Sequence, residues 1–167
     1  ATSVKDLALQ AVEWMRCSGV TYGDIRFVTI REQDIAVKNA VVESVSDERT
    51  CGFGVRVLKN GAWGFYASRR PTEEEVARAV RQACDIAVAS AHVAGPPVRL
   101  APQEAHRGRY TTPHQRDPFA VPLSDKLNVL VRASERLMGH PVALAQAFFA
   151  AWDTEKLFAS TEGSLIE

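Results

Sequence analysis

Residues 50–68 read Thr-Cys-Gly-Phe-Gly-Val-Arg-Val-Leu-Lys-Asn-Gly-Ala-Trp-Gly-Phe-Tyr-Ala-Ser. Two segments rich in β-branched and aromatic residues flank Asn60-Gly61, the dipeptide that best tolerates the positive φ angles of a type I′ turn. The stretch therefore predicts a β-hairpin. A two-residue turn also fixes the register, which pairs Leu58 with Trp63, Arg56 with Phe65, Gly54 with Ala67, Val57 with Gly64 and Val55 with Tyr66.

The chain before this hairpin predicts a helix and then strands. Ser3 can cap an amphipathic helix that ends at Gly19. Residues 24–38 alternate like a long strand, and residues 41–46 should pair back on it. The turn between them contains Asn39-Ala40, and because alanine has a steric cost at positive φ, a longer or different turn is possible there.

Charged residues 47–49 then lead into the hairpin, so that we expect a meander of four strand segments. Such a sheet needs helices to cover it. Thr72 begins a capping-box pattern after Pro71, and the small apolar residues that follow predict a helix that lies close to the sheet. A third helix is predicted after Pro122, ending at Gly139.

Residues 94–122 contain six prolines and few periodic apolar positions, which predicts a long loop. At the C-terminal end, residues 142–152 and 156–161 alternate as two strands of a hairpin around a turn at residues 153–155. Residues 164–167 would only begin the next strand, so we expect an unpaired edge and a longer natural protein. The whole pattern predicts an α+β fold of helix, strands, helix, long loop, helix and hairpin.

Composition excludes several classes of protein. The 167 residues carry 20 basic and 20 acidic side chains, and this zero net charge gives no overall attraction to nucleic acid or to a membrane. No apolar run is long enough to span a bilayer, so we expect a soluble cytoplasmic protein. Three cysteines without a Cys-x-x-Cys pair predict reduced and mostly buried thiols.

Candidate chemistry is sparse. None of the histidines has a second ligand at helical metal-binding spacing, and the only imaginable metal cluster joins His106, His114, Glu104 and Asp117 of the loop, whose side chains are better interpreted as solvated. We expect no catalytic, cofactor-binding or metal-binding residue in this chain. Arg99, Arg107, Arg109 and Arg116 make residues 99–116 locally basic, which is the best nucleic-acid candidate, although an ordinary solvated loop is favoured.

Arg56 and Trp63 are the remaining candidates. If the hairpin lies in the sheet, the guanidinium of Arg56 lies between the aromatic rings of Phe65 and Trp63. One interpretation is an ion-paired surface arginine. The other is a passage through which a peptide substrate moves, and the sequence leaves both open.

Residues 50–68 occur together with four shorter segments in a fixed order: Tyr22-Gly23-Asp24-Ile25-Arg26, Val42-Glu43-Ser44-Val45-Ser46, Asp117-Pro118-Phe119 and residues 155–163. In these segments and in their order, the chain resembles the N-terminal domain of the TldD/PmbA family of metallopeptidases, also described as modulators of DNA gyrase. Trp63 before Gly64 is more similar to the TldD branch. At Asn39-Ala40 the sequence departs from the family's usual Asn-Gly.

This resemblance implies that residues 1–167 form one N-terminal domain, with residues 94–122 as a loop inside it. It implies a substrate-access and assembly role in a cytoplasmic peptidase that cleaves unfolded or short polypeptides, with a TldD/PmbA-type partner subunit or a second copy. Zinc and its His-Glu-x-x-x-His ligands would belong to the catalytic domain that follows, so this chain alone is expected to be inactive. The alternatives are a peptide- or protein-binding module that uses an exposed sheet edge and a nucleic-acid contact through residues 99–116.

Overall fold

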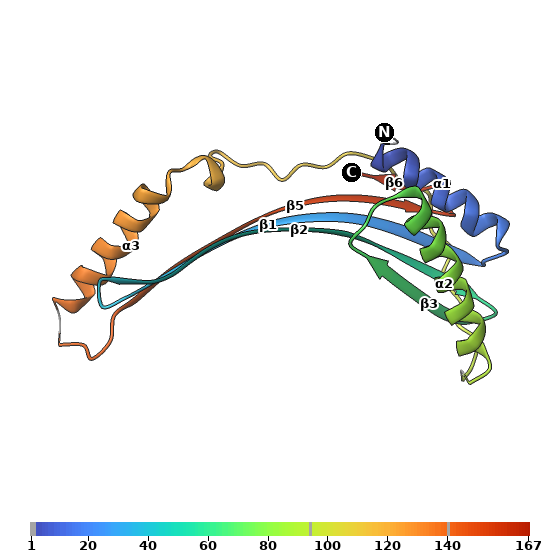
Figure 1. Ribbon diagram of the computed structural model, residues 1–167, viewed down its shortest axis with the longest axis horizontal. Coiled ribbons are helices and arrows are strands. Elements are labelled where there is room, and N and C mark those ends of the chain that lie inside the picture. Colours follow the sequence, from blue (N-terminus) through green and yellow to red (C-terminus); the bar gives the residue numbers. More distant parts are fainter. Residues whose placement is uncertain (1–2, 94, 140) are drawn as a thin grey trace. The chain divides into compact units, whose positions relative to one another are not determined.

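The computed structural model describes residues 3–93, 95–139 and 141–167. Its helices and strands are α1 (Val4–Cys17), β1 (Tyr22–Lys38), β2 (Val41–Lys59), β3 (Ala62–Ser68), α2 (Glu73–Ala91), β4 (Arg107–Gly108), the 3-10 helix η1 (Pro118–Ala120), α3 (Leu123–Met138), β5 (Gln146–Ser160) and β6 (Leu165–Ile166) (Figure 1). The strand order is β3-β2-β1-β5-β6-β4. The fold is α+β with a mostly antiparallel sheet, as the sequence predicts.

The chain divides into two compact units. Unit 1 comprises Ala1–Thr29, Cys51–Thr111 and Glu155–Glu167, and unit 2 comprises Ile30–Thr50 and Thr112–Thr154. Strands β1, β2 and β5 contribute residues to both units. Each unit has a hydrophobic core of its own.

In unit 1, helices α1 and α2 pack on one face of the sheet. The capping box at Ser3 and Asp6 starts α1, and Thr72 accepts a hydrogen bond from the Glu75 amide at the start of α2. The core joins apolar residues of both helices to inward-facing strand residues such as Ile25 and Val57. Gly64 lets α2 approach β3 closely, because a Cβ atom there would collide with the backbone of Ala83 and Ala87.

The hairpin of β2 and β3 has the predicted register, with Leu58 opposite Trp63 and Arg56 opposite Phe65. Asn60 and Gly61 have φ angles of 53° and 78°, as a type I′ turn requires. The prediction for residues 50–68 is therefore confirmed. The expected break at residues 47–49 is wrong, since β2 runs without interruption through these charged residues, whose side chains are exposed.

In unit 2, helix α3 packs on one face of β1 and β5. Ile35, Val37 and Leu130 are buried there, with Phe149 packed against them. The turn between β1 and β2 contains only Asn39 and Ala40, at φ angles of 48° and 62°. The two-residue turn is thus retained despite alanine.

Contacts from the rest of unit 2 explain how this turn is held. Asn39 donates its amide to the Ala145 carbonyl, and its side-chain oxygen accepts from the Ala145 amide. The Ser134 hydroxyl of α3 accepts a hydrogen bond from the Ala40 amide at 2.9 Å. These bonds stabilise a backbone conformation that alanine alone disfavours.

The predicted turn at residues 153–155 is wrong, because β5 continues through it from Gln146 to Ser160. The antiparallel hairpin forms instead at the turn that follows β5, where Phe158 and Ala159 of β5 pair with β6. The expected unpaired edge beyond residue 164 is wrong as well, because β4 from the proline-rich loop pairs in parallel with β6. Backbone bonds of Leu165 and Glu167 to this loop complete the pairing.

The cysteines also differ from the prediction. Cys84 is buried, whereas Cys17 and Cys51 are exposed. Cys17 lies at the end of α1, beyond the buried stripe that ends at Met15, and Cys51 lies in the exposed part of β2. In the described part of the chain, no helix is long and apolar enough to cross a membrane.

Candidate functional site

Arg56 and Trp63 lie on the face of the unit 1 sheet opposite α1 and α2. Successive strand residues point to opposite faces, and their neighbours Val55, Val57 and Gly64 face the helices. The guanidinium carbon of Arg56 lies 4.8 Å from the centre of the Trp63 ring. The structure therefore brings the two predicted residues together.

Asp24 of β1 holds Arg56 in place. The Nε and Nη2 atoms of Arg56 donate hydrogen bonds to the same Asp24 oxygen at 2.9 Å and 2.7 Å. The side chain of Asp24 is 2% exposed, whereas that of Arg56 is 41% exposed. A buried carboxylate thus fixes an arginine whose outer part reaches solvent, and charge-assisted bonds of this kind are among the stronger ones in proteins.

Tyr22 is the second aromatic partner of Arg56, at 5.9 Å from its ring centre, in place of the expected Phe65. Tyr22 also meets Trp63 edge to face, with ring centres 6.0 Å apart. The Phe65 ring lies beside Gly54, where the missing side chain leaves room for it. The alternative of an ion-paired arginine therefore describes the contacts of Arg56, with two rings beside it.

Burial and the charge of Asp24 shift the pKa values of Tyr22 and Arg56. Burial, together with the negative charge of Asp24, raises the pKa of Tyr22 to about 12. Burial by itself would lower the pKa of Arg56, but hydrogen bonds and the charge of Asp24 outweigh it and raise this pKa. At neutral pH Tyr22 is a neutral hydroxyl and Arg56 a cation.

Arg26 extends the cluster along β1. Its Nε atom lies 3.4 Å from the other oxygen of Asp24, and its guanidinium lies 5.3 Å from the centre of the Phe158 ring. Two arginines thus share one buried carboxylate, which leaves an excess positive charge next to aromatic side chains. Such an arrangement can bind the carbonyl or carboxylate oxygens and the apolar side chains of a polypeptide.

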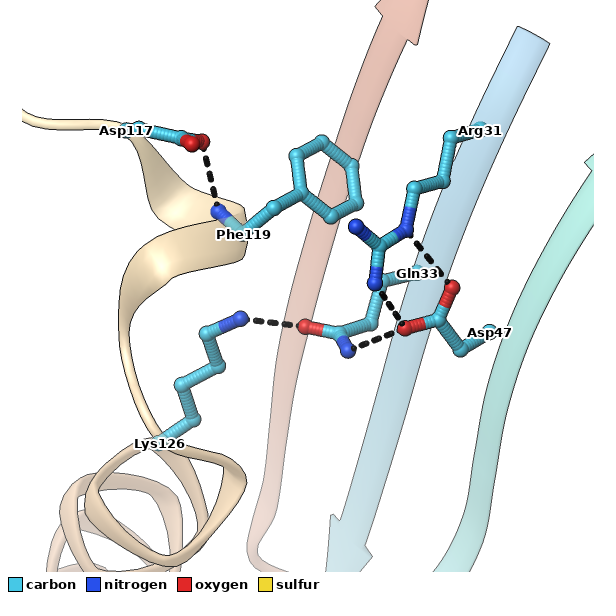
Figure 2. A network of polar contacts seen from close by, with 6 residues as sticks. All are labelled: Arg31, Gln33, Asp47, Asp117, Phe119 and Lys126. Carbon is cyan, nitrogen blue, oxygen red and sulfur yellow. Dashed lines mark hydrogen bonds and ion pairs between the residues drawn. The ribbon is translucent and has the colours of Figure 1, made fainter.

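A second polar network lies in unit 2, between α3 and the strands (Figure 2). Arg31 donates to both oxygens of Asp47, at 3.0 Å and 2.8 Å, and Gln33 donates to Asp47 at 3.0 Å. The ammonium of Lys126 donates to the side-chain oxygen of Gln33. The bonds to Arg31 lower the pKa of Asp47 and raise that of Arg31.

Aromatic rings flank the cations of this network. The Phe119 ring lies 4.6 Å from the guanidinium of Arg31, and the Lys126 ammonium lies 4.9 Å from the Phe149 ring. Asp117 accepts the Phe119 amide at 2.8 Å, which sets the start of η1 (Figure 2). The Asp117-Pro118-Phe119 segment thus places an aromatic ring against β1.

Sequence reasoning missed Asp24 and Lys126 as partners. Asp24 lies in one of the family-like segments, but its role depends on β1 lying next to β2. Lys126 precedes Leu130 and Ser134 by four and eight positions on α3, so it continues a line of buried residues. A lysine on the buried side of an amphipathic helix is the signal that could have indicated this network.

The residues of the imagined metal cluster do not form a ligand set. His106 belongs to unit 1 and His114 to unit 2, and His140 lies outside the described residues. Within residues 3–93, 95–139 and 141–167, no three histidine, cysteine, aspartate or glutamate side chains gather as metal ligands. The metal-binding side chains within these ranges therefore do not fit a zinc site.

One arginine side chain of the basic loop makes a hydrogen bond among the described residues. Arg107 donates its Nε atom to the Gly163 carbonyl at 3.0 Å, beside the pairing of β4 with β6. Arg99, Arg109 and Arg116 are exposed.

Known proteins share this architecture. The fold matches crystal structures of two proposed modulators of DNA gyrase, from Thermotoga maritima (TM-score 0.72, 14% identity, 98% of this chain and 36% of that one) and Bacteroides thetaiotaomicron (0.73, 13%, 96% and 37%). It also matches TldE from Thermococcus kodakarensis, with a TM-score of 0.68 and 14% identity over 95% of this chain and 36% of that one. These likenesses define the fold.

Sequence comparison finds related proteins. Residues 23–87 match the model of the PmbA/TldA metallopeptidase domain 1. The chain is 28% identical over 150 residues to a metalloprotease of Methanothermobacter thermautotrophicus and 24% identical over 146 residues to one of Methanocaldococcus jannaschii, which covers 89% and 87% of this chain. The chain is therefore similar in sequence to these metalloproteases, and its residues 23–87 match the first domain of the PmbA/TldA metallopeptidases. It spans 31% and 32% of the length of these two relatives.

Proposed function

We propose that residues 1–167 form the N-terminal substrate-access and assembly domain of a cytoplasmic zinc metallopeptidase that cleaves unfolded or short polypeptides. The match of residues 23–87 to a metallopeptidase first domain supports this proposal, as do the two relatives named metalloproteases. The metal and the general base would come from residues outside this chain. A TldD/PmbA-type subunit or a second copy would complete the assembly.

The observation that carries the access role is the cluster of Asp24, Arg56 and Trp63. The ion pair with Asp24 fixes the orientation of Arg56. The half-exposed guanidinium and the indole ring of Trp63 therefore form a preorganised polar and aromatic surface. The carbonyl oxygens of a peptide that passes along this face can accept hydrogen bonds from the Arg56 guanidinium, and its side chains can pack on Trp63. Contacts of this kind hold any sequence, which suits an unfolded substrate.

Kinetics of the full-length protein test the access role. Replacing Arg56 by Gln or Trp63 by Ala should raise KM for an unfolded polypeptide while kcat changes little, because both contacts act on binding and not on the bond that breaks. Arg31→Gln is the matched control, since Arg31 is also ion-paired and lies beside an aromatic ring but belongs to unit 2. If the Arg56 and Trp63 variants fold and their KM is unchanged, the proposed access role is wrong.

The chain by itself offers a second test. We expect no peptide hydrolysis by residues 1–167 and no stoichiometric zinc after mild dialysis, because the possible ligands among the described residues do not gather at one place. Near-equimolar zinc that is lost on mutating His106 and His114 would contradict this assignment.

One observation favours a different class, a binding module that pairs a partner strand along a sheet edge. Strand β3 stands at one end of the strand order, so one side of its backbone faces no neighbouring strand in the part of the chain that the structure describes. The coding sequence downstream of Glu167 distinguishes the two functions. A His-Glu-x-x-x-His segment there supports the peptidase, whereas a stop codon supports the module.

A further inference from the structure

The unit 2 sheet has a second face, opposite α3, that carries exposed aromatic residues. Ala147 and Phe149 of β5 pack with Ile35 and Val37 of β1 in the core under α3. By alternation, the residues between them point to the other face. On that face Phe148 is 66% exposed and Trp152 is 68% exposed.

Carboxylates lie beside these rings. Glu32 and Asp34 flank the buried Gln33 on β1, the strand next to β5, so they share the face of Phe148 and Trp152. Both are exposed, and in the described part of the chain neither takes part in a salt bridge. Lys38 lies further along β1. Its ammonium is 3.6 Å from a carboxylate oxygen of Glu43, and this ion pair compensates its positive charge. This face, defined by Glu32, Asp34, Phe148 and Trp152 and called the acidic aromatic face, is negatively charged.

The outer edge of β5 is open next to this face. Strand β6 pairs with β5 through Phe158 and Ala159, which belong to unit 1. Among the described residues, the backbone of residues 146–152 has no hydrogen bond outside its own strand pairing. An extended chain can therefore add to this edge, and every second side chain would then project on the acidic aromatic face.

We propose that this face binds an extended polypeptide segment rich in lysine or arginine. Basic side chains at alternate positions would lie against Phe148 and Trp152, whose rings attract cations, and reach the carboxylates of β1 across the small Ala150. The negative charge disfavours nucleic acid, and a purely apolar partner would bury Glu32 and Asp34 without compensation. This binding stands independently of any peptidase activity.

Fluorescence anisotropy with labelled ten-residue peptides tests the proposal on the full 167-residue chain. A peptide that alternates lysine and threonine should bind, whereas a glutamate-threonine peptide should not, and binding should weaken as salt is raised. Trp152→Ala and the double variant Glu32→Gln with Asp34→Asn should each weaken the lysine peptide by about fivefold or more. Tyr110→Ala, which removes an exposed ring from unit 1, is the control and should bind as the parent does.

Further measurements separate the other outcomes. Methylating alternate backbone amides of the lysine peptide should abolish binding if the peptide pairs with β5, and unchanged binding would overturn the edge pairing. Equal affinity for both peptides, or no effect of the Trp152 and carboxylate variants, would overturn the proposal. So would sedimentation that shows self-association lost in Trp152→Ala, because the face would then join two copies of this chain.

Discussion

At the unit 1 site, we expect replacement of Asp24 to be among the most destabilising changes. Its side chain is buried and accepts two hydrogen bonds from Arg56. Asn at this position keeps the shape but removes the charge, so the arginine is left without its counter-ion. We expect the free energy of unfolding in urea to fall by about 2 kcal/mol, less than for a fully buried pair because Arg56 is half exposed.

Asp47→Asn is the matched control for this prediction. Asp47 also accepts two hydrogen bonds from an arginine, Arg31, but the Asp47 side chain is 38% exposed, whereas that of Asp24 is buried. Its loss should lower stability by clearly less than the loss of the Asp24 charge. Equal losses for the two variants would show that burial does not decide the strength of the Asp24 contact.

Ala40 offers a change that should stabilise the protein. Its φ angle of 62° lies in the left-handed region, which costs an alanine about 1 kcal/mol relative to glycine. Ala40→Gly should therefore raise the free energy of unfolding by up to about 1 kcal/mol, with the bond from its amide to Ser134 retained. Ala36→Gly in the middle of β1 should have the opposite sign, because glycine there only adds flexibility to the unfolded chain.

At the scale of secondary structure, the packing of α2 on β3 depends on Gly64. A Cβ atom there would lie 2.7 Å from the Ala87 amide and would also collide with the Ala83 carbonyl. Backbone atoms cannot move aside as a side chain can, so Gly64→Ala should destabilise by about 2 kcal/mol or more and loosen α2 in hydrogen exchange. Gly54→Ala is the control, because the close contacts of its new Cβ would be with the movable ring of Phe65, and the nearest backbone atom, the Tyr66 carbonyl oxygen, lies at an ordinary 3.9 Å.

Local sequence predicted the elements that local chemistry determines. Asn60-Gly61 fixed the hairpin register, and Ser3 and Thr72 marked the helix starts, because turns and caps depend on adjacent residues. The long strands were missed where their side chains are exposed. Charged residues 47–49 and 153–155 resemble turns in the sequence, yet the neighbouring β1 supplies the backbone bonds that keep β2 and β5 extended.

In the candidate site, too, the sequence predicted the contacts between residues close in the chain and missed those between distant elements. Arg56 and Trp63 share a face of one hairpin, so the turn alone brings them close. Asp24 and the pair of Gln33 and Lys126 meet through elements that are distant in sequence, and their contacts follow only from the strand order and the packing of α3. Residues 106–110 illustrate the same limit, since this loop forms β4 only because β6 is there to pair with it.

At the scale of the whole molecule, the titration of Tyr22 makes the free energy of unfolding depend on pH in the alkaline range. Its pKa is raised from 10.0 to about 12 in the folded state, because burial and the charge of Asp24 disfavour the phenolate. The unfolded chain therefore releases this proton at lower pH than the folded one. Its contribution to stability is complete below pH 10 and is lost progressively as the pH rises toward 12.

We expect the free energy of unfolding to decrease more steeply between pH 10 and pH 12 in the parent chain than in Tyr22→Phe. Phenylalanine keeps the ring beside Trp63 and Arg56 but has no proton to release. Urea unfolding at closely spaced pH values measures the difference, which cancels the titration of lysines and other groups common to both chains. Tyr110→Phe, which removes an exposed hydroxyl outside this cluster, is the control. If Tyr22→Phe shows the same slope as the parent, then the Tyr22 hydroxyl titrates alike in the folded and unfolded chains, and Asp24 does not act on it.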